Sequence, residues 1–115
     1  MKIEVLVPTY NKSIDEIIDL YSFLNIKSDA LFANQSNHNN VIETNINGKK
    51  LRVIFTKTVG VSINRNILQE NCMGDICVCT DDDCPLSENY EDIVTQFYDK
   101  NKPVYVIFNG LLKHH

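Results

Sequence analysis

The sequence predicts an α/β domain with a mostly parallel sheet and helices on both faces of that sheet. Two observations support this class. Short apolar runs typical of strands alternate along the chain with segments in which apolar residues recur at helical spacing. A strand, a following helix and the next strand usually place the two strands parallel and the helix against the sheet. The predicted order is strand, helix, strand, hairpin, helix, strand, helix, strand.

The first part of the chain predicts a strand, a helix and a second strand. Residues 3–7 form an apolar run, and Pro8 should end it because proline cannot donate a hydrogen bond to a neighbouring strand. Ser13 and Glu16 have the spacing of a capping box, which predicts the start of a helix. Its apolar stripe is expected at Ile14, Ile17, Ile18, Tyr21 and Leu24. Residues 30–33 predict a short strand, and the polar residues 34–40 predict a loop.

The middle of the chain predicts a hairpin and a helix. Asn47 and Gly48 separate two strand-like segments, residues 41–46 and 49–56. Both residue types tolerate a positive φ, so this pair predicts a tight hairpin turn. Ser62 should cap a helix that runs to about Cys72.

The last part of the chain predicts a strand, a helix and a final strand. Residues 76–80 are a short continuous apolar run, which suits a strand inside a sheet. Ser87 should open the helix, and residues 104–108 should form the last strand. The helical stripe is expected at Tyr90, Ile93, Val94, Phe97 and Tyr98. Residues 1–110 are therefore expected to form one domain, and residues 111–115 a ragged tail that is natural or a purification remnant.

Composition narrows the class of protein. The chain has 115 residues, of which 43% are hydrophobic, so it is long enough for one core and too apolar to be disordered. Its formal net charge of -4 argues against nucleic-acid binding, which needs basic patches. No apolar run is long enough to cross a bilayer, and no signal peptide opens the chain. We therefore expect a cytoplasmic protein.

Four cysteines lie close together in the sequence, at Cys72, Cys77, Cys79 and Cys84. Structural zinc sites usually show pairs of cysteines separated by two residues, and this spacing is different. We expect reduced, buried thiols in a cytosolic core, with structural zinc as the alternative.

Asp81, Asp82 and Asp83 directly follow the predicted interior strand. Three adjacent carboxylates repel one another unless a cation lies among them, and Mg²⁺ and Mn²⁺ prefer such oxygen ligands. In open parallel sheets, ligands bind beyond the carboxyl ends of the strands. The triplet therefore predicts a divalent metal site that holds a phosphate ester through the metal. The alternative is an acidic surface turn that caps the next helix.

Two further segments could contribute to a site. Residues 8–11 offer a rigid turn, an aromatic ring and an amide, a combination that can hold a nucleobase. Gly60 precedes a predicted helix N-terminus, a place suited to anions, and Arg65 adds a fork of hydrogen-bond donors. The ordinary alternatives are a strand-to-helix loop and a surface arginine.

Three motifs in this order resemble the GT-A glycosyltransferases, specifically the large inverting family known as family two. They are V-L-V-P-T-Y-N at residues 5–11, G-V-S-I-N-R-N at residues 60–66, and G-D-I-C-V-C-T-D-D-D-C-P-L-S-E-N-Y at residues 74–90. The resemblance implies a Rossmann-like, nucleotide-binding GT-A half. It also implies a nucleotide-sugar donor, usually a uridine diphosphate (UDP) sugar, and an Mn²⁺ or Mg²⁺ ion on the diphosphate.

The resemblance also implies roles for individual residues. Asp83 would be the first metal ligand, Asp81 would contact the ribose or assist the metal, and Asp82 would support either. The uracil pocket would be lined by Pro8, Thr9, Tyr10 and Asn11. Arg65 and Asn66 would lie beneath the donor. Relatives usually carry Asp-Asp-Gly-Ser after the second strand, where this chain has Ala33-Asn34-Gln35-Ser36. Asn34 could still bind the base, as a neutral group.

Length sets a limit on the predicted activity. A GT-A catalytic domain is typically more than twice as long, and its second half supplies the acceptor site and the catalytic base. We therefore expect a truncated, donor-binding half that does not complete glycosyl transfer. A full-length form would be a hexosyltransferase-type enzyme that could associate peripherally with a membrane. The alternatives are a non-catalytic nucleotide-binding module and a small interaction domain that forms a homodimer.

Overall fold

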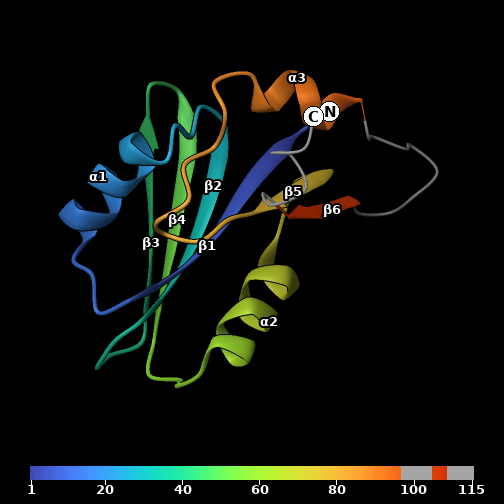
Figure 1. Ribbon diagram of the computed structural model, residues 1–115. Coiled ribbons are helices and arrows are strands. Elements are labelled where there is room, and N and C mark those ends of the chain that lie inside the picture. Colours follow the sequence, from blue (N-terminus) through green and yellow to red (C-terminus); the bar gives the residue numbers. More distant parts are fainter. Residues whose placement is uncertain (97–104, 109–115) are drawn as a thin grey trace.

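The computed structural model describes residues 1–96 and, for the backbone alone, residues 105–108. The elements in chain order are β1 (Ile3–Tyr10), α1 (Ile14–Phe23), β2 (Asp29–Gln35), β3 (Asn40–Ile46), β4 (Lys49–Thr56), α2 (Val61–Asn71), β5 (Ile76–Cys79), α3 (Tyr90–Thr95) and β6 (Tyr105–Phe108). The strands form one six-stranded sheet in the order β3-β4-β2-β1-β5-β6 (Figure 1). The α/β class with a mixed sheet is confirmed.

The sheet has one point at which the direction of winding reverses. The pairs β1–β2, β2–β4, β1–β5 and β5–β6 are parallel, and β3–β4 is antiparallel. From β1 the chain builds outward through β2 to β4, and α2 then returns it to β5 on the other side of β1. The reversal therefore falls between β1 and β5. In open α/β sheets this point leaves a crevice beyond the carboxyl ends of the strands.

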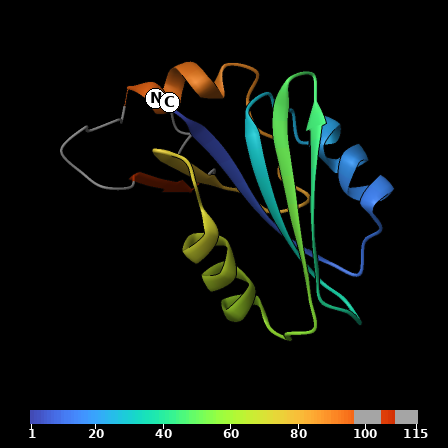
Figure 2. The ribbon, with the colours of Figure 1, turned by 180° about the vertical axis from the view of Figure 1, so that it is seen from behind.

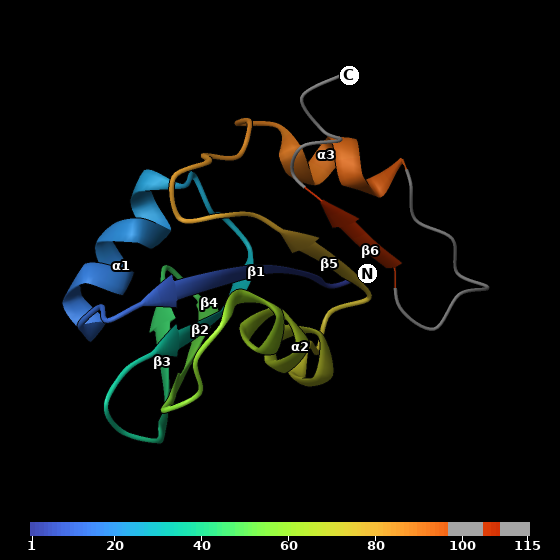
Figure 3. The same ribbon diagram turned by 60° about the horizontal axis from the view of Figure 1, so that its bottom comes forward.

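Helices cover both faces of the sheet. Figures 2 and 3 show α1 and α3 on one face and α2 on the other. The larger buried cluster joins α1 and α3 to the sheet through Ile17, Tyr90 and Val94. The smaller cluster joins α2 to the opposite face and contains Leu6, Leu31, Ala33, Leu68 and Cys77. Neighbouring residues of a strand point to opposite faces, which is why Val5 and Leu6 belong to different clusters.

The first strand is longer than the sequence predicted, because Pro8 does not end it. Strand β1 pairs with β2 as far as Tyr10, whereas β5 stops opposite Leu6. The Leu6 carbonyl accepts from the Thr80 N–H at 3.1 Å, so the alternating backbone places the Pro8 nitrogen on the β5 side as well. Since β5 has already ended there, the missing N–H of Pro8 breaks no pair.

The predicted loop at residues 34–40 is also too long. Strand β2 continues through Asn34 and Gln35, and β3 begins at Asn40. Both added residues of β2 are buried, although their polarity predicted exposure. The hairpin at Asn47 and Gly48 is confirmed, with φ of 52° and 83° at these two residues.

Helix α1 confirms the predicted capping box, with hydrogen bonds in both directions between Ser13 and Glu16. The bond from the Ser13 N–H to the Glu16 Oε1 atom is the main cause that lowers the pKa of the Glu16 carboxyl, because the charged carboxylate accepts it. The predicted apolar stripe of α1 was wrong at Ile18, which is 36% exposed. Leu20, which was not predicted, packs against the core instead.

The other two helices begin at residues that differ from the predicted ones. Ser62 is not the cap of α2, which has Gly60 in that position with a φ of 114°. Helix α3 begins at Tyr90 after an Asn89 cap, rather than at Ser87. The expected stripe residues Phe97 and Tyr98 and the predicted tail lie outside the described residues. Across the described part of the chain, no helix has the length and apolar character needed to span a membrane.

The expectation of four reduced thiols is wrong for one pair. Cys72 and Cys77 form a disulfide that joins the C-terminal cap of α2 to β5. Cys79 and Cys84 are not part of this disulfide. Since zinc binds thiolates rather than a disulfide, the alternative of a four-cysteine zinc site does not apply to this form of the chain.

Candidate functional site

The candidate site lies where the winding of the sheet reverses, at the carboxyl end of β5 and beside the second half of β1. Cys79 pairs with Leu6, and Thr80 continues the ladder through its N–H. The acidic triplet therefore leaves β5 just past Leu6, whereas β1 continues to Tyr10. Figure 3 shows these two strands next to each other, with α2 on one side of them.

The acidic triplet forms a closed turn. The Cys84 N–H donates to the Asp81 carbonyl at 3.2 Å, and the Thr80 hydroxyl donates to the Cys84 carbonyl at 2.7 Å. This turn brings possible ligand atoms of Asp81, Asp83 and Cys84 within 4.8 Å of one another. The predicted pair Asp81 and Asp83 is thus brought together, whereas Asp82 is outside the group.

The donor set of this turn fits a hard divalent ion in part. Asp81 and Asp83 are exposed and offer carboxylate oxygens, which suit Mg²⁺ and Mn²⁺. The Cys84 thiol is a softer donor and is not a typical Mg²⁺ ligand. Its sulfur lies 3.4 Å from the Asp83 Oδ1 atom, so the thiol can donate to that carboxylate. The two carboxylates are the part of the group that fits the metal.

Helix α2 places one cation beside the triplet. The Arg65 Nη2 atom lies 3.8 Å from the Asp81 Oδ1 atom, and both side chains are about half exposed. Such an exposed pair contributes less than about 1 kcal/mol to stability. Arg65 therefore remains able to turn toward another anion at this edge of the sheet.

The free thiol of Cys79 lies close to these charges. Burial raises its pKa to about 11, Arg65 lowers the pKa slightly, and Asp81 raises it further. The thiol is therefore neutral at physiological pH, since the thiolate would be poorly solvated there. A neutral thiol is neither a good nucleophile nor a good metal ligand.

Asn34 holds the connection between β1 and α1 in place. Its side chain is 0% exposed, and its Oδ1 atom accepts from the Thr9 hydroxyl at 2.8 Å and from the Lys12 N–H at 3.1 Å. Its Nδ2 group donates to the Lys12 carbonyl at 2.9 Å. All three bonds stay within the protein. In this structure Asn34 therefore positions the loop, and its amide is not open to a base.

Two further buried amides, which sequence reasoning missed, attach the start of α2 to the sheet. The Gln35 Nε2 group donates to the Gly60 carbonyl at 2.7 Å. Asn64, which is 3% exposed, donates from Nδ2 to the Ala33 carbonyl at 2.9 Å, and its Oδ1 atom is buried without a partner. The sequence signal for the burial of Gln35 was its position next to an apolar strand, but polar residues in that position usually indicate a loop.

The remaining predicted residues are divided between exposed and buried positions. Tyr10 is 72% exposed, and Asn11 is exposed with a φ of 52°. Thr9 is buried and its hydroxyl is used by Asn34. Pro8 is half-buried, and Asn66 is exposed on α2. Tyr10 and Asn11 are thus the members of the predicted uracil pocket that a ligand could reach most freely.

Comparison with protein-family models, with curated proteins and with solved structures finds no match to this chain. The functional argument therefore rests on the residues and their arrangement.

Proposed function

We propose that this chain binds the diphosphate of a nucleotide sugar, such as a UDP-sugar, through a divalent metal at the Asp81–Asp83 turn. In this proposal the chain is the donor-binding half of a Rossmann-like GT-A domain of the family-two type. The observation that supports it is the position of the acidic turn, at the carboxyl end of β5 where the winding of the sheet reverses beside β1. Ligands of open α/β sheets bind at this point.

The proposal gives each reachable group a role. Asp83 and Asp81 would hold Mn²⁺ or Mg²⁺, and the ion would offset the charge of the diphosphate. Arg65 would add a second positive charge. Tyr10 at the end of β1 offers an exposed ring on which the base can stack, and Asn34 holds the loop that follows Tyr10 in position. No catalytic base is assigned, so this is a proposal for binding and not for turnover.

Titration calorimetry of the chain with UDP, with and without Mn²⁺, tests this proposal. We expect binding that requires the metal and weakens at least about tenfold in Asp83→Asn and Asp81→Asn. Asp82→Asn is the matched control, because it removes the same charge from a carboxylate outside the group. It should change the affinity by less than about threefold.

Two results would contradict the proposal. One is UDP binding that does not depend on Mn²⁺ or Mg²⁺. The other is equal loss of affinity in Asp82→Asn and Asp83→Asn, which would indicate an effect of total charge rather than a metal site. The absence of any nucleotide binding would also contradict the proposal and would leave the interaction-domain alternative, for which light scattering would show whether the chain forms a dimer.

A further inference from the structure

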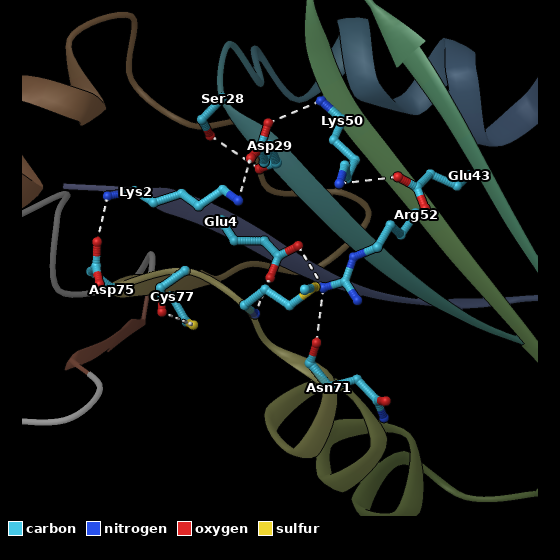
Figure 4. A network of polar contacts seen from close by, with 12 residues as sticks. Lys2, Glu4, Ser28, Asp29, Glu43, Lys50, Arg52, Asn71, Asp75 and Cys77 are labelled. Carbon is cyan, nitrogen blue, oxygen red and sulfur yellow. Dashed lines mark hydrogen bonds and ion pairs between the residues drawn. The ribbon is translucent and has the colours of Figure 1, made fainter.

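The connection between α2 and β5 is held by an ion pair and several hydrogen bonds, shown in Figure 4. Arg52 donates from Nη2 to the Glu4 Oε2 atom and to the Asn71 carbonyl, both at 2.8 Å. The Glu4 Oε1 atom accepts from the Met73 N–H at 2.7 Å. Glu4 is buried in β1, and Arg52 comes from β4. Side chains of two other strands thus fix the backbone at the end of α2.

The start of β5 is tied down separately. The Asp75 N–H donates to the Lys2 carbonyl at 2.7 Å, and the Lys2 N–H donates to the Asp75 carboxylate at 2.8 Å. These contacts involve no sulfur atom. The path of the chain from α2 to β5 therefore does not depend on the disulfide between Cys72 and Cys77, and that bond can open without loss of the sheet.

The two cysteine residues of the disulfide differ in exposure. Cys72 is half-buried at the end of α2, whereas Cys77 is fully buried in β5. An external thiolate therefore reaches Cys72 more easily. Cys79 packs against the same cluster on the α2 face and is not part of the bond.

We propose that the Cys72–Cys77 disulfide is a reversible redox modification site, opened by a dithiol reductant that attacks the Cys72 sulfur. The reductant thiolate forms a mixed disulfide with Cys72, and Cys77 leaves as a thiolate that takes up a proton. The second thiol of the reductant then releases Cys72 as a thiol and leaves with an internal disulfide. Two electrons and two protons pass from the reductant to the chain. Oxidised glutathione, a small-molecule disulfide, reverses the step.

Opening of this bond removes one of the constraints on the last turn of α2, while the contacts of Arg52 and Glu4 still hold the end of the helix to the sheet. Helix α2 carries Arg65, and β5 leads into Asp81. The disulfide therefore links the two elements that position the ion pair between Arg65 and Asp81. The amide bonds of Gln35 and Asn64 hold the first turn of α2 in both redox forms. The change is therefore confined to the C-terminal end of the helix. The effect of reduction on ligand affinity rests on the proposed function, whereas the opening and closing of the disulfide does not.

Thiol counting after equilibration in glutathione buffers tests whether the disulfide opens and closes reversibly. The chain is unfolded in denaturant with excess iodoacetamide, so that buried and exposed thiols are alkylated alike, and is then digested and mapped by mass spectrometry. We expect two reactive thiols, Cys79 and Cys84, in the oxidised form and four in the reduced form. Hydrogen exchange should be about tenfold faster in the last turn of α2 after reduction, and unchanged in its first turn.

Three variants serve as controls. Cys72→Ser and Cys77→Ala should each give exchange like that of the reduced form and no response to oxidant. Cys79→Ser should respond as the parent chain does, because its thiol is outside the bond. Four reactive thiols in oxidising buffer, a mapped Cys79–Cys84 bond, or identical exchange in both redox forms would each overturn the proposal.

Nucleotide titration separates this inference from the proposed function. A redox-dependent change in exchange with no binding of UDP and Mn²⁺ contradicts the proposed function and supports the switch. Metal-dependent UDP binding by a chain that never forms the disulfide supports the proposed function and contradicts the redox proposal. If both proposals hold, the affinity for UDP with Mn²⁺ should differ between the two redox forms.

Discussion

Replacement of Asn34 by alanine should destabilise the chain by about 3 kcal/mol. The substitution removes three side-chain hydrogen bonds, to the Thr9 hydroxyl, the Lys12 N–H and the Lys12 carbonyl. Each bond of this kind contributes about 1 kcal/mol net, and the side chain is 0% exposed, so water cannot fully replace it. This loss is a large fraction of the roughly 5–15 kcal/mol by which a domain is typically stable.

Urea unfolding measures this change. With a slope of about 1.5 kcal/mol per molar urea, the midpoint should fall by about 2 M while the slope stays constant. Asn66→Ala is the matched control, because it is the same substitution at an exposed position of α2, and it should change stability by less than about 0.5 kcal/mol. Amide exchange at Lys12 should also become faster in Asn34→Ala only.

Asn34→Asp examines the direction of the hydrogen bonds. It keeps the acceptor for Thr9 and Lys12 but replaces the donor to the Lys12 carbonyl with a second oxygen. Burial should raise the pKa of this new carboxyl, so the folded variant favours the protonated form, which can donate. Its stability should therefore be greatest at low pH and decrease as pH rises through the raised pKa. An Asn34→Ala cost below about 1 kcal/mol, or an Asn34→Asp variant as stable as the parent at neutral pH, would refute the assignment of Asn34 as a loop-positioning residue.

Three further predictions concern other parts of the fold. Glu4→Leu leaves the charge of Arg52 buried and should cost about 3 kcal/mol in urea unfolding, and Glu4→Leu with Arg52→Met should cost less than the sum of the two single changes. Gly60→Ala should cost about 1–2 kcal/mol because alanine is strained at a φ of 114°. No atom lies within 4 Å of the added methyl group, so a steric clash does not contribute to this cost. An unchanged urea midpoint would contradict the prediction. Burial raises the pKa of Tyr21 from 10.0 to about 12, so its contribution to stability is complete below pH 10.0 and is lost as pH rises toward 12. Burial also raises the pKa of Cys79 from 9.0, so the loss of stability should begin near pH 9.0. In Cys79→Ser, the free energy of unfolding should stay constant between pH 9.0 and 10.0.

Features that depend on a few neighbouring residues could be predicted from the sequence. The hairpin follows from the tolerance of Asn47 and Gly48 for positive φ, and the start of α1 follows from the reciprocal bonds of Ser13 and Glu16. The apolar run at residues 76–80 indicated a buried strand that leads into the acidic triplet, and β5 has this position. These signals are local because the atoms that produce them are only a few residues apart.

Features that depend on distant contacts could not be predicted in this way. Whether Pro8 ends a strand depends on where the neighbouring β5 stops, which is a property of the pairing between β1 and β5. Polar Asn34 and Gln35 are buried because loops at residues 12 and 60 supply their partners. Their sequence signal is that of a surface loop, and only these contacts offset the cost of burying them.

The sequence alone determined that this chain alternates strands and helices, and that three carboxylates follow an apolar strand. Those results come from periodicity and residue type, which act over short distances along the chain. The tertiary structure decided which strands are neighbours, and so placed the acidic turn beside the second half of β1, with Asp81 within reach of Arg65. It also joined Cys72 to Cys77, where the sequence suggested four thiols. The physical reason is that strand order is set by packing between residues far apart in the sequence, which no local pattern records.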